Sequence, residues 1–299
     1  MMKWFDYLSL LSWQNCKITK KDFMSLYSQD IQSPENLTSI VETIETKQYL
    51  ISNKYWWKKA ETDYKYCQKR NYQLLAPNHS AYPQQILDFF DNTPIFLVLG
   101  NLSFQTTFLP VTFVGSRKAD ELVLNWMDFY LPPLLKEKQI CIVSGGARGI
   151  DQKAHKIAIR SQQPTLCFLP SGLDYIYPDS LHLIKSAILD NGGAFISSFP
   201  PWVRMQKSYF HIRNAFMSAY SQLVVILQAQ LRSGTMLTAK KSLDFGVPIG
   251  VLPGPALSVN WTGNLQLIYD GAYLIRDNVD LNVLIESLSL TKPLFKEMT

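Results

Sequence analysis

The sequence has no long hydrophobic run and little charge. Its longest unbroken apolar stretches are five residues, at 95–99 and 223–227, whereas a membrane-spanning helix needs roughly 18. Near the N-terminus Asp6 interrupts the apolar residues and no small-residue cleavage site follows, which disfavours a secretory signal. Charged residues make up 18% and hydrophobic residues 47% of the 299 residues, a balance that excludes a disordered chain. We therefore expect a globular protein with no membrane contact and a cytoplasmic location.

Cysteine and histidine are also scarce. The four cysteines are far apart in the sequence, and Cys141 and Cys167 stand in apolar runs typical of buried strands. This placement favours small buried thiols in a reducing compartment over disulfides or a metal site. The four histidines form no pair at ligand spacing, so we predict no structural metal. The other members of the two sets are Cys16, Cys67, His79, His155, His182 and His211.

Acidic residues are missing from one long segment. The net charge of +5 is too small to indicate a nucleic-acid partner by itself. Between Asn191 and Leu243, however, there are six basic residues and no Asp or Glu. Two buried strands and their connections would also dilute acids, but binding of an anionic partner is the interpretation we favour. The six residues are Arg204, Lys207, Arg213, Arg232, Lys240 and Lys241.

The first 70 residues and the remainder differ in pattern. Residues 1–70 are rich in Lys, aromatic and aliphatic residues at helical spacing, which predicts a small helical N-terminal domain. In residues 71–299 short apolar runs alternate with helical stretches, as in a parallel sheet covered on both faces. We predict an α/β fold with a doubly wound, mostly parallel sheet. The predicted strands are 95–99, 111–114, 140–143, 165–169, 194–196, 223–227, 249–252 and 273–275, and a last helix is expected over 280–288.

Three glycine-containing turns follow predicted strands, at residues 115–117, 144–151 and 231–235. In an open α/β sheet, anions bind beyond the carboxyl ends of strands, where helix N-termini present backbone N–H groups. Each turn also carries an arginine: Arg117, Arg148 and Arg232. The turns match neither the dinucleotide fingerprint nor the P-loop, so we expect no nucleotide cofactor. The alternative is that the glycines serve tight connections only, and Asp151 is expected to anchor its own turn.

The segment before the predicted strand 223–227 combines rings and cations. Residues 199–214 are predicted to form a long loop that carries Trp202, Tyr209 and Phe210 among basic side chains. Cations hold phosphates and exposed rings stack on bases, so this mixture suits single-stranded nucleic acid. We expect Trp202 and Tyr209 to pack beneath the loop and Phe210 to be free for stacking.

These motifs, in this order over residues 71–277, resemble the DNA-processing protein A family (DprA, also called Smf). The resemblance implies a cytoplasmic bacterial protein with an extended Rossmann-like domain and no catalytic activity. It further implies a homodimer that binds and protects incoming single-stranded DNA and loads the RecA recombinase during natural transformation. The matching motifs are Tyr82-Pro83, Gly115-Ser116-Arg117, 144–151, Gly172-Leu173-Asp174, Tyr177-Pro178, Phe210 with Arg213-Asn214, Ser233-Gly234-Thr235, Pro253-Gly254 and Gly263-Asn264.

The resemblance also assigns DNA contacts. Our hypothesis is that Arg117, Lys207 and Arg213 neutralise consecutive phosphates while Phe210 stacks a base. Dimerisation is implied for apolar residues within about 257–288. The DNA-binding residues that the resemblance implies are Gly115, Ser116, Arg117, Lys207, Phe210 and Arg213, to which the turns and the acid-free segment add Arg148, Arg232 and Lys240.

The chain departs from the family pattern at three positions. Ser198 and Gln228 stand where the family usually has Glu, and Ala215 stands where it usually has Arg. The two lost carboxylates favour phosphate binding, whereas the missing arginine removes one possible clamp or ion pair.

Two other functions remain open. A nucleotide-processing enzyme of the related lysine-decarboxylase-like superfamily would need a Glu after its Gly-Thr turn, but Gly234-Thr235 is followed by Met236, Leu237 and Thr238. The carboxylate required for acid or base catalysis is therefore missing there. A nucleotide sensor could use the same sheet edge, although the long basic and aromatic segment exceeds what a mononucleotide needs.

Overall fold

The structure is a computed structural model that divides the chain into two compact units. It describes residues 10, 18–27, 33, 36–42, 44–53, 55–77, 79, 82–83, 86–87, 89–90 and 94–290. Unit 1 is drawn from Met1–Gly100, Ser171–Tyr175 and Ile196–Met205. Unit 2 is drawn from Asn101–Pro170, Ile176–Phe195 and Gln206–Thr299.

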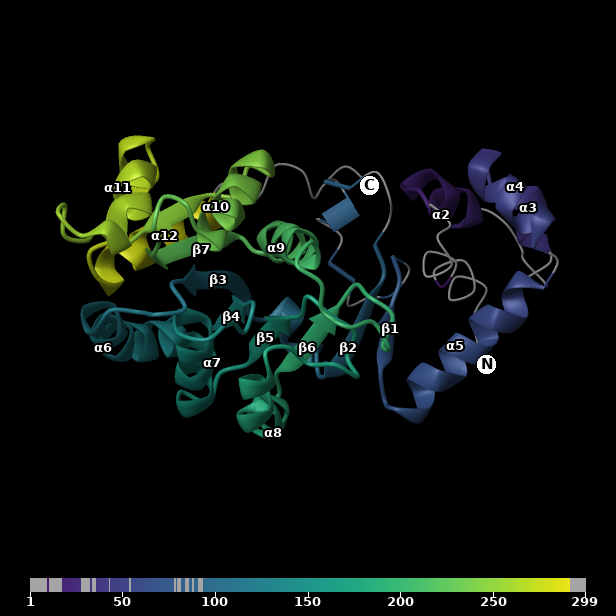
Figure 1. Cartoon of the computed structure of the whole chain (residues 1–299), viewed down its shortest axis with the longest axis horizontal. Coiled ribbons are helices and arrows are strands. Elements are labelled where there is room, and N and C mark those ends of the chain that lie inside the picture. Colours follow the sequence, from purple (N-terminus) through teal and green to yellow (C-terminus); the bar gives the residue numbers. More distant parts are fainter. Residues whose placement is uncertain are drawn as a thin grey trace. The chain divides into compact units, whose positions relative to one another are not determined.

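The longest helix of unit 1 among the described residues is α5, Trp56–Lys69 (Figure 1). The helix buries Trp56, Ala60 and Cys67, which lie on one side because they are spaced by four and seven residues. After α5 the chain forms a two-stranded antiparallel pair, β1 with β2. The remaining unit 1 elements are α2 Lys20–Tyr27, α3 Leu37–Ile40, α4 Ile44–Ser52, β1 Gln73–Leu75 and β2 Phe96–Gly100.

Unit 2 contains a run of six parallel strands in the order β5-β4-β3-β7-β8-β9. The chain moves outward from β3 to β5 and later returns to the other side of β3, so the strand order reverses at β3. In doubly wound sheets ligands bind at such a reversal, beyond the carboxyl ends of the strands. The strands are β3 Leu109–Gly115, β4 Ile140–Ser144, β5 Thr165–Phe168, β7 Leu223–Gln228, β8 Ile249–Val251 and β9 Tyr273–Leu274, while β6, Ala194–Ser197, passes from unit 2 into unit 1 at Ile196.

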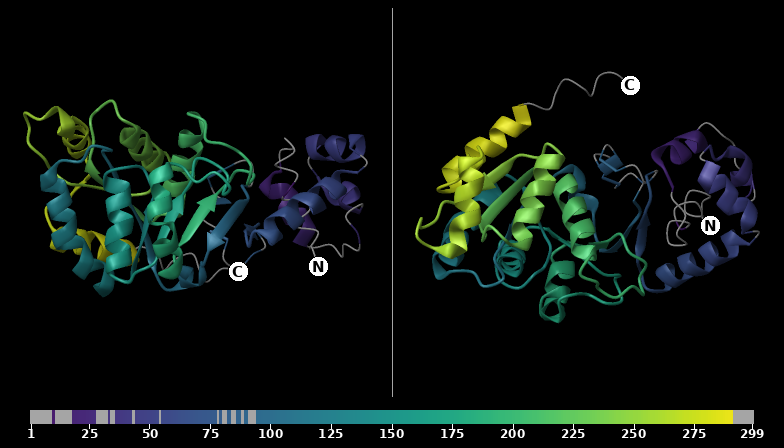
Figure 2. Two further views of the ribbon diagram at one scale, coloured as in Figure 1. Left: turned by 60° about the horizontal axis from the view of Figure 1, so that its bottom comes forward. Right: turned by 45° about the horizontal axis from the view of Figure 1, so that its top comes forward.

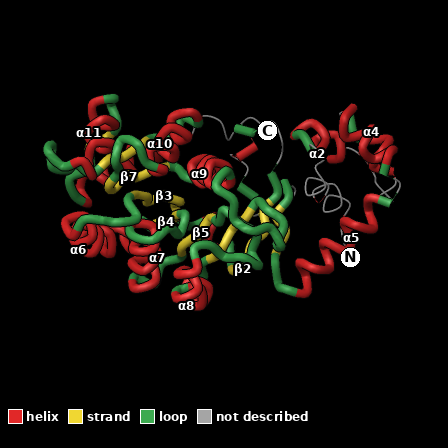
Figure 3. Tube along the Cα trace, viewed as in Figure 1, coloured by secondary structure: helices red, strands yellow, loops and turns green. Residues whose placement is uncertain are grey.

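Helices cover both faces of the unit 2 sheet (Figures 1 and 3). Alternate strand residues such as Val111 and Phe113 of β3 pack in one core with α6, α7 and α12, as the two-residue period of a strand requires. Helices α9 and α10 lie side by side on the opposite face (Figure 2). The unit 2 helices are α6 Glu121–Glu137, α7 Ile150–Arg160, α8 Lys185–Asp190, α9 Tyr209–Tyr220, α10 Gly234–Asp244, α11 Thr262–Tyr269 and α12 Asn278–Leu290, with short 3-10 helices at Ser103–Thr106, Asp179–Leu183 and Val259–Trp261.

The predicted α/β class and mostly parallel sheet are confirmed. Every predicted strand is present within one or two residues, and the last helix extends over 278–290. One prediction is wrong: residues 199–214 are not a continuous loop, because helix α9 begins at Tyr209. Its residues 213–220 are all buried, and no side-chain bond caps its N-terminus. Tertiary packing therefore stabilises this helix. The domain boundary near residue 70 stays a prediction.

The predicted state of the cysteines is confirmed for the part of the chain that the structure describes. Cys67, Cys141 and Cys167 are free and buried, while Cys16 lies outside the described residues. Burial raises the pKa of the Cys67 thiol to about 12 and also raises those of Cys141 and Cys167, so all three stay protonated and unreactive. Among the described residues no cluster of His, Cys, Asp or Glu is placed to hold a metal ion. Each described helix is too short or too polar to span a bilayer.

Candidate functional site

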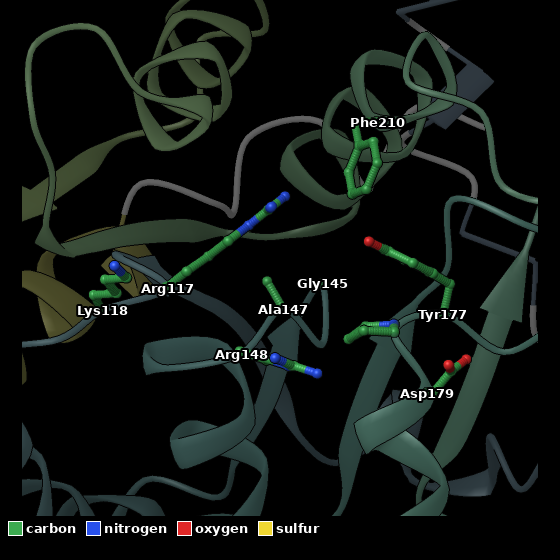
Figure 4. A pocket seen from close by; sticks show the side chains of 9 residues that line it. Arg117, Lys118, Gly145, Ala147, Arg148, Tyr177, Asp179 and Phe210 are labelled. Carbon is green, nitrogen blue, oxygen red and sulfur yellow. The ribbon is translucent and has the colours of Figure 1, made fainter.

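A pocket of about 610 Å³ lies at the carboxyl ends of the unit 2 strands. It is framed by the turn after β3, the turn after β4, the segment 177–179 and the first turn of α9 (Figure 4). This is the sheet edge at which the sequence predicted anion binding. Its lining residues are Arg117, Lys118, Gly145, Ala147, Arg148, Tyr177, Pro178, Asp179 and Phe210.

The turn after β3 presents two cations. Arg117 and Lys118 are exposed, and in Figure 4 the Arg117 side chain extends across the pocket toward Phe210. The Ser116 hydroxyl donates to the Lys118 carbonyl at 2.8 Å and accepts from the Lys118 N–H at 3.1 Å. Ser116 therefore closes the turn that presents the cations, and its hydroxyl proton is already used there.

The turn after β4 has its backbone donors occupied by Asp151. The Asp151 carboxylate is 4% exposed and accepts from the N–H groups of Gly145 at 3.2 Å and Ala147 at 3.3 Å. Burial raises the pKa of Asp151, opposed by the Arg213 guanidinium and by backbone donors that include the Gly115 N–H. The prediction that Asp151 anchors its own turn is confirmed. Since an internal carboxylate holds these amides, anion binding here depends on side chains instead.

The ring of Phe210 stands in the first turn of α9 with cations beside it. The ring is partly exposed, and its centroid lies 5.8 Å from the Arg117 guanidinium and 5.6 Å from that of Arg213. The Tyr177 ring meets it edge-on at 6.0 Å, an arrangement that favours a fixed ring orientation. Phe210 thus places a partly exposed ring in a pocket that is lined by three cations and one carboxylate, while its role in stacking stays a prediction.

Arg213 lies beneath the pocket and not on its rim. It is 6% exposed, and its Nη1 occupies the space that a Cβ on Gly145 would need, 1.1 Å away. Burial lowers the pKa of the guanidinium, opposed by Asp151, and its Nε has no hydrogen-bond partner among the described residues. In this arrangement Arg213 acts as an internal counter-charge for Asp151, so the geometry does not favour a direct phosphate contact.

His155 completes the buried group under the two turns. Its Nδ1 lies 2.7 Å from the Thr165 hydroxyl, which itself donates to the Ile142 carbonyl at 2.8 Å. Because that hydroxyl proton is already used, Nδ1 must be the protonated nitrogen. Burial, with a smaller effect of Arg213, lowers the pKa of His155 to about 3, so the imidazole is neutral.

The structure places the other predicted residues outside the pocket lining. Gly115 ends β3 at a shift in register, and a Cβ there would meet the Ile150 side chain at 2.3 Å, so it serves close packing. Lys207 is exposed two residues before α9 begins. Arg232 and Lys240 are also exposed, the former before α10 and the latter within it.

The sequence interpretation missed three polar side chains in the lining. Lys118 directly follows the first turn motif and could have been included with it. Tyr177 was recognised as part of a turn motif, and its hydroxyl points toward the centre of the pocket (Figure 4). Asp179 had no sequence signal, because its place in the lining depends on how the segment after residue 176 folds back.

The family model for DNA recombination-mediator protein A matches residues 73–286. Protein Smf of Escherichia coli K12 is 31% identical over 220 residues, which are 74% of this chain and 58% of Smf. DNA processing protein DprA of Streptococcus pneumoniae R6 is 28% identical over 201 residues, 67% of this chain and 70% of DprA. This chain thus spans little more than half the length of the Escherichia coli relative.

Solved structures agree. DNA processing protein A from Streptococcus pneumoniae superposes with a TM-score of 0.75 at 21% identity, covering 93% of this chain and 97% of the other, which shows a shared fold. The structure of DNA processing protein A from Helicobacter pylori, described for its single-stranded DNA binding mode, gives a TM-score of 0.63 at 28% identity over 72% of this chain and 96% of the other. With a family model that matches most of its length, this chain belongs to the DNA recombination-mediator protein A family.

Proposed function

We propose that the protein binds single-stranded DNA at the pocket beside Phe210. The observation that carries the proposal is a partly exposed aromatic ring in a pocket that is also lined by three exposed cations, Arg117, Lys118 and Arg148. None of the three forms an ion pair within the described residues, so each is available to a phosphate. A ring offers a stacking surface that paired bases of a duplex do not reach, which favours a single strand.

The side chains divide the work in this proposal. Asp151 occupies backbone donors of the glycine turns, so Arg117, Lys118 and Arg148 take the phosphates. Lys207, exposed before the N-terminus of α9, adds a cation close in sequence to Phe210, at a helix end that also favours anions. Phe210 stacks one base, while Asp151, His155 and Arg213 hold the turns in place.

The same geometry favours a binding protein over an enzyme. Asp151 is buried and accepts two backbone hydrogen bonds, so it is poorly placed to take a proton from a substrate. In helix α10 the first carboxylate after Gly234-Thr235 is Asp244, at the other end of the helix. We therefore propose a mediator without catalytic activity of its own.

Fluorescence anisotropy of labelled oligo-dT and of a matching duplex at several salt concentrations tests the proposal. We expect salt-sensitive binding to the single strand and much weaker binding to the duplex. Arg117→Ala and Arg148→Ala should each lower the affinity about tenfold and reduce the slope of log K against log salt by about 0.7. Arg160→Ala is the matched control, because Arg160 is an exposed unit 2 arginine already paired with Asp128. Equal affinities for wild type and both pocket variants would refute the proposal, as would binding of mononucleotides alone.

Three finer proposals follow from family membership. The protein loads the RecA recombinase onto DNA during natural transformation, and it does so in the cytoplasm, where that DNA arrives. It acts as a homodimer, which is supported by exposed apolar side chains within 257–288. Light scattering should give a molar mass twice that of one chain. The Tyr269→Lys variant should give the mass of a single chain. The supporting side chains are Leu257, Val259, Tyr269, Tyr273, Leu274, Val279 and Val283.

A further inference from the structure

Unit 1 carries a second group of rings and cations, which we name the Trp202 surface. It consists of Lys59 and Tyr66 of α5, Tyr175, and the pair Trp202 and Arg204. Trp202 and Tyr175 remain 39% and 38% exposed. The sequence led us to expect Trp202 to pack beneath its loop, so its exposure is a correction. The DNA-binding proposal for the pocket does not use any of these five residues.

A partly buried carboxylate, Asp174, holds the Trp202 surface in place. The Asp174 carboxylate accepts from the hydroxyls of Tyr66 at 2.6 Å and Tyr72 at 2.9 Å, and it pairs with Arg70 at 3.3 Å. The Asp174 N–H donates to the Pro201 carbonyl at 3.1 Å. These bonds join α5 to the segments 171–175 and 196–205, and they neutralise the acid beside the surface.

Each exposed ring has a cation over it. The Arg204 guanidinium lies 4.1 Å from the centroid of the Tyr175 ring, and the Lys59 ammonium lies 5.8 Å from that of Trp202. Trp202 also meets the Tyr66 ring edge-on at 5.4 Å, which fixes its orientation. The rings are thus held with part of their surface facing solvent, as stacking on a base requires.

The charge of this surface is positive because no described acidic side chain pairs with Arg204. Lys59 pairs with Asp63 at 2.9 Å, and Arg70 pairs with Asp174. Arg204 is exposed, and within the described part of the chain it forms no ion pair. It belongs to the acid-free segment 191–243, so a polyanion would meet no opposing carboxylate from its own segment. A free guanidinium stacked on a ring suits a phosphate next to a base.

We propose that the Trp202 surface is a second contact for single-stranded DNA, with Trp202 and Tyr175 stacking bases and Arg204 holding a phosphate. This inference rests on the proposed function for its ligand. Arg204 stands three residues before Lys207, a length of chain that spans at most about 11 Å. A strand held at Lys207 thus has the next cation of the same segment within a few nucleotides.

Length-dependent binding separates this surface from the pocket. Oligo-dT of six and of twenty nucleotides are titrated against the full chain by anisotropy at several salt concentrations. Arg204→Ala and Trp202→Ala should weaken binding of the longer strand about three- to tenfold and change binding of the shorter strand by less than twofold, because a short strand fills the pocket first. Arg204→Ala should also lower the salt slope for the longer strand by about 0.7.

Two further variants serve as controls. Lys65→Ala removes another exposed cation of α5, one that pairs with Glu61, and should leave both affinities unchanged. Arg204→Lys keeps the charge but loses the planar stack, so it should restore the salt slope and only part of the affinity. Photocrosslinking of iodouracil-substituted strands should label Trp202 or Tyr175 in addition to pocket residues.

The outcomes distinguish the two proposals. If the wild-type protein does not bind single strands, and no variant differs from it in affinity, the proposed function itself fails. If Arg117→Ala weakens binding while Arg204→Ala and Trp202→Ala leave the longer strand unaffected, the pocket proposal survives and the second contact is refuted. Crosslinks confined to residues that line the pocket, such as Tyr177 and Phe210, would refute it as well.

Discussion

Two arginines near the same ring behave in opposite ways. Arg117 and Arg213 place their guanidinium groups 5.8 Å and 5.6 Å from the Phe210 centroid. Arg117 is exposed on the rim of the pocket, whereas Arg213 is 6% exposed beneath it, beside Gly145 and coupled to Asp151. Distance from the ring therefore does not separate a binding residue from a structural one, but solvent exposure does.

In the proposed site, the backbone donors of the glycine turn after β4 are already used inside the protein. The buried carboxylate of Asp151 takes the amides of the glycine turn, and Arg213 compensates its charge from below. A buried charge is tolerated only when it is paired. We call the exposed cations Arg117, Lys118 and Arg148 the rim, and the buried Asp151, His155 and Arg213 the floor. In the proposed site the rim cations are available to an external ligand, so rim variants should alter affinity and floor variants should alter stability.

The largest effect is expected for Arg213→Leu. Removing the guanidinium leaves the Asp151 carboxylate uncompensated and opens space under Gly145, so the free energy of unfolding should fall by about 3–5 kcal/mol. Urea denaturation followed by far-UV circular dichroism measures it. Arg117→Ala is the matched control and should stay within about 0.5 kcal/mol of wild type. Equal losses for the two variants would remove the distinction between rim and floor.

A smaller but clear loss is expected for Gly149→Ala. Gly149 has φ of +81° and a Cβ there would lie 2.4 Å from the Ser116 carbonyl oxygen, so it joins the two turns at a point where a side chain does not fit. We expect a loss of about 2–4 kcal/mol, measured by the same denaturation.

Gly246→Ala is the control that measures the cost of a positive φ alone, without the steric clash expected for Gly149→Ala. Gly246 has φ of +65° but nothing within 4 Å of its Cβ position, so it should lose only about 1 kcal/mol. If Gly149→Ala cost no more than Gly246→Ala, the contact between the two turns would not be rigid.

The sequence allowed the strands and turns around the site to be predicted, but not which of the site's side chains are buried. Near-continuous apolar runs such as 223–227 allowed the strands to be predicted, and Asp151, at the end of the glycine turn 144–151, was expected to anchor that turn. Arg213 was misplaced because a basic residue in an acid-free segment is usually solvated. Its burial depends on Gly145, which stands 68 positions earlier in the sequence.

The local sequence pattern also failed to predict helix α9 and the exposure of Trp202. Helix α9 begins after Ser208, a residue type that often caps helices, but Ser208 makes no side-chain cap bond, so a serine by itself did not mark the start. Trp202 packs edge-on against Tyr66, whose hydroxyl donates to Asp174, a residue 28 positions before Trp202 in the sequence. Long-range contacts decided both features, and a single sequence does not display them.

Phe210→Leu tests the rim through stacking instead of charge. Leucine keeps an apolar side chain in the first turn of α9 but offers no flat surface, so single-strand affinity should fall about five- to tenfold, within the range of one lost stacked base. The salt slope should stay at the wild-type value, because no phosphate contact is removed. Anisotropy against oligo-dT gives both quantities, and a changed slope would show that the ring acts by positioning Arg117.

The last prediction concerns the stability of the buried group beneath the pocket as the pH changes, an effect that is small at any one pH near neutrality. Burial lowers the pKa of His155 to about 3, with Arg213 as the second cause, whereas the unfolded chain protonates histidine near pH 6.5. Between these values the unfolded state binds more protons, so the contribution of His155 to stability is complete above about pH 6.5 and declines as the pH falls toward 3, by at most about 1.4 kcal/mol per unit.

His155→Asn isolates that contribution. Asparagine can still donate to the Thr165 hydroxyl but does not titrate, so stability of the variant should vary less steeply than wild type across this window. Burial also raises the pKa of Asp151, which contributes with the opposite sign, and the difference between wild type and variant at each pH removes it. In an Arg213→Leu background the nearby positive charge is gone, so the pKa of His155 should rise and the window should narrow from its acidic end. If the pH range of this stability difference did not change, the Arg213 charge would not influence the pKa of His155. The contrast between the exposed and the buried residues of the site would then rest on burial alone.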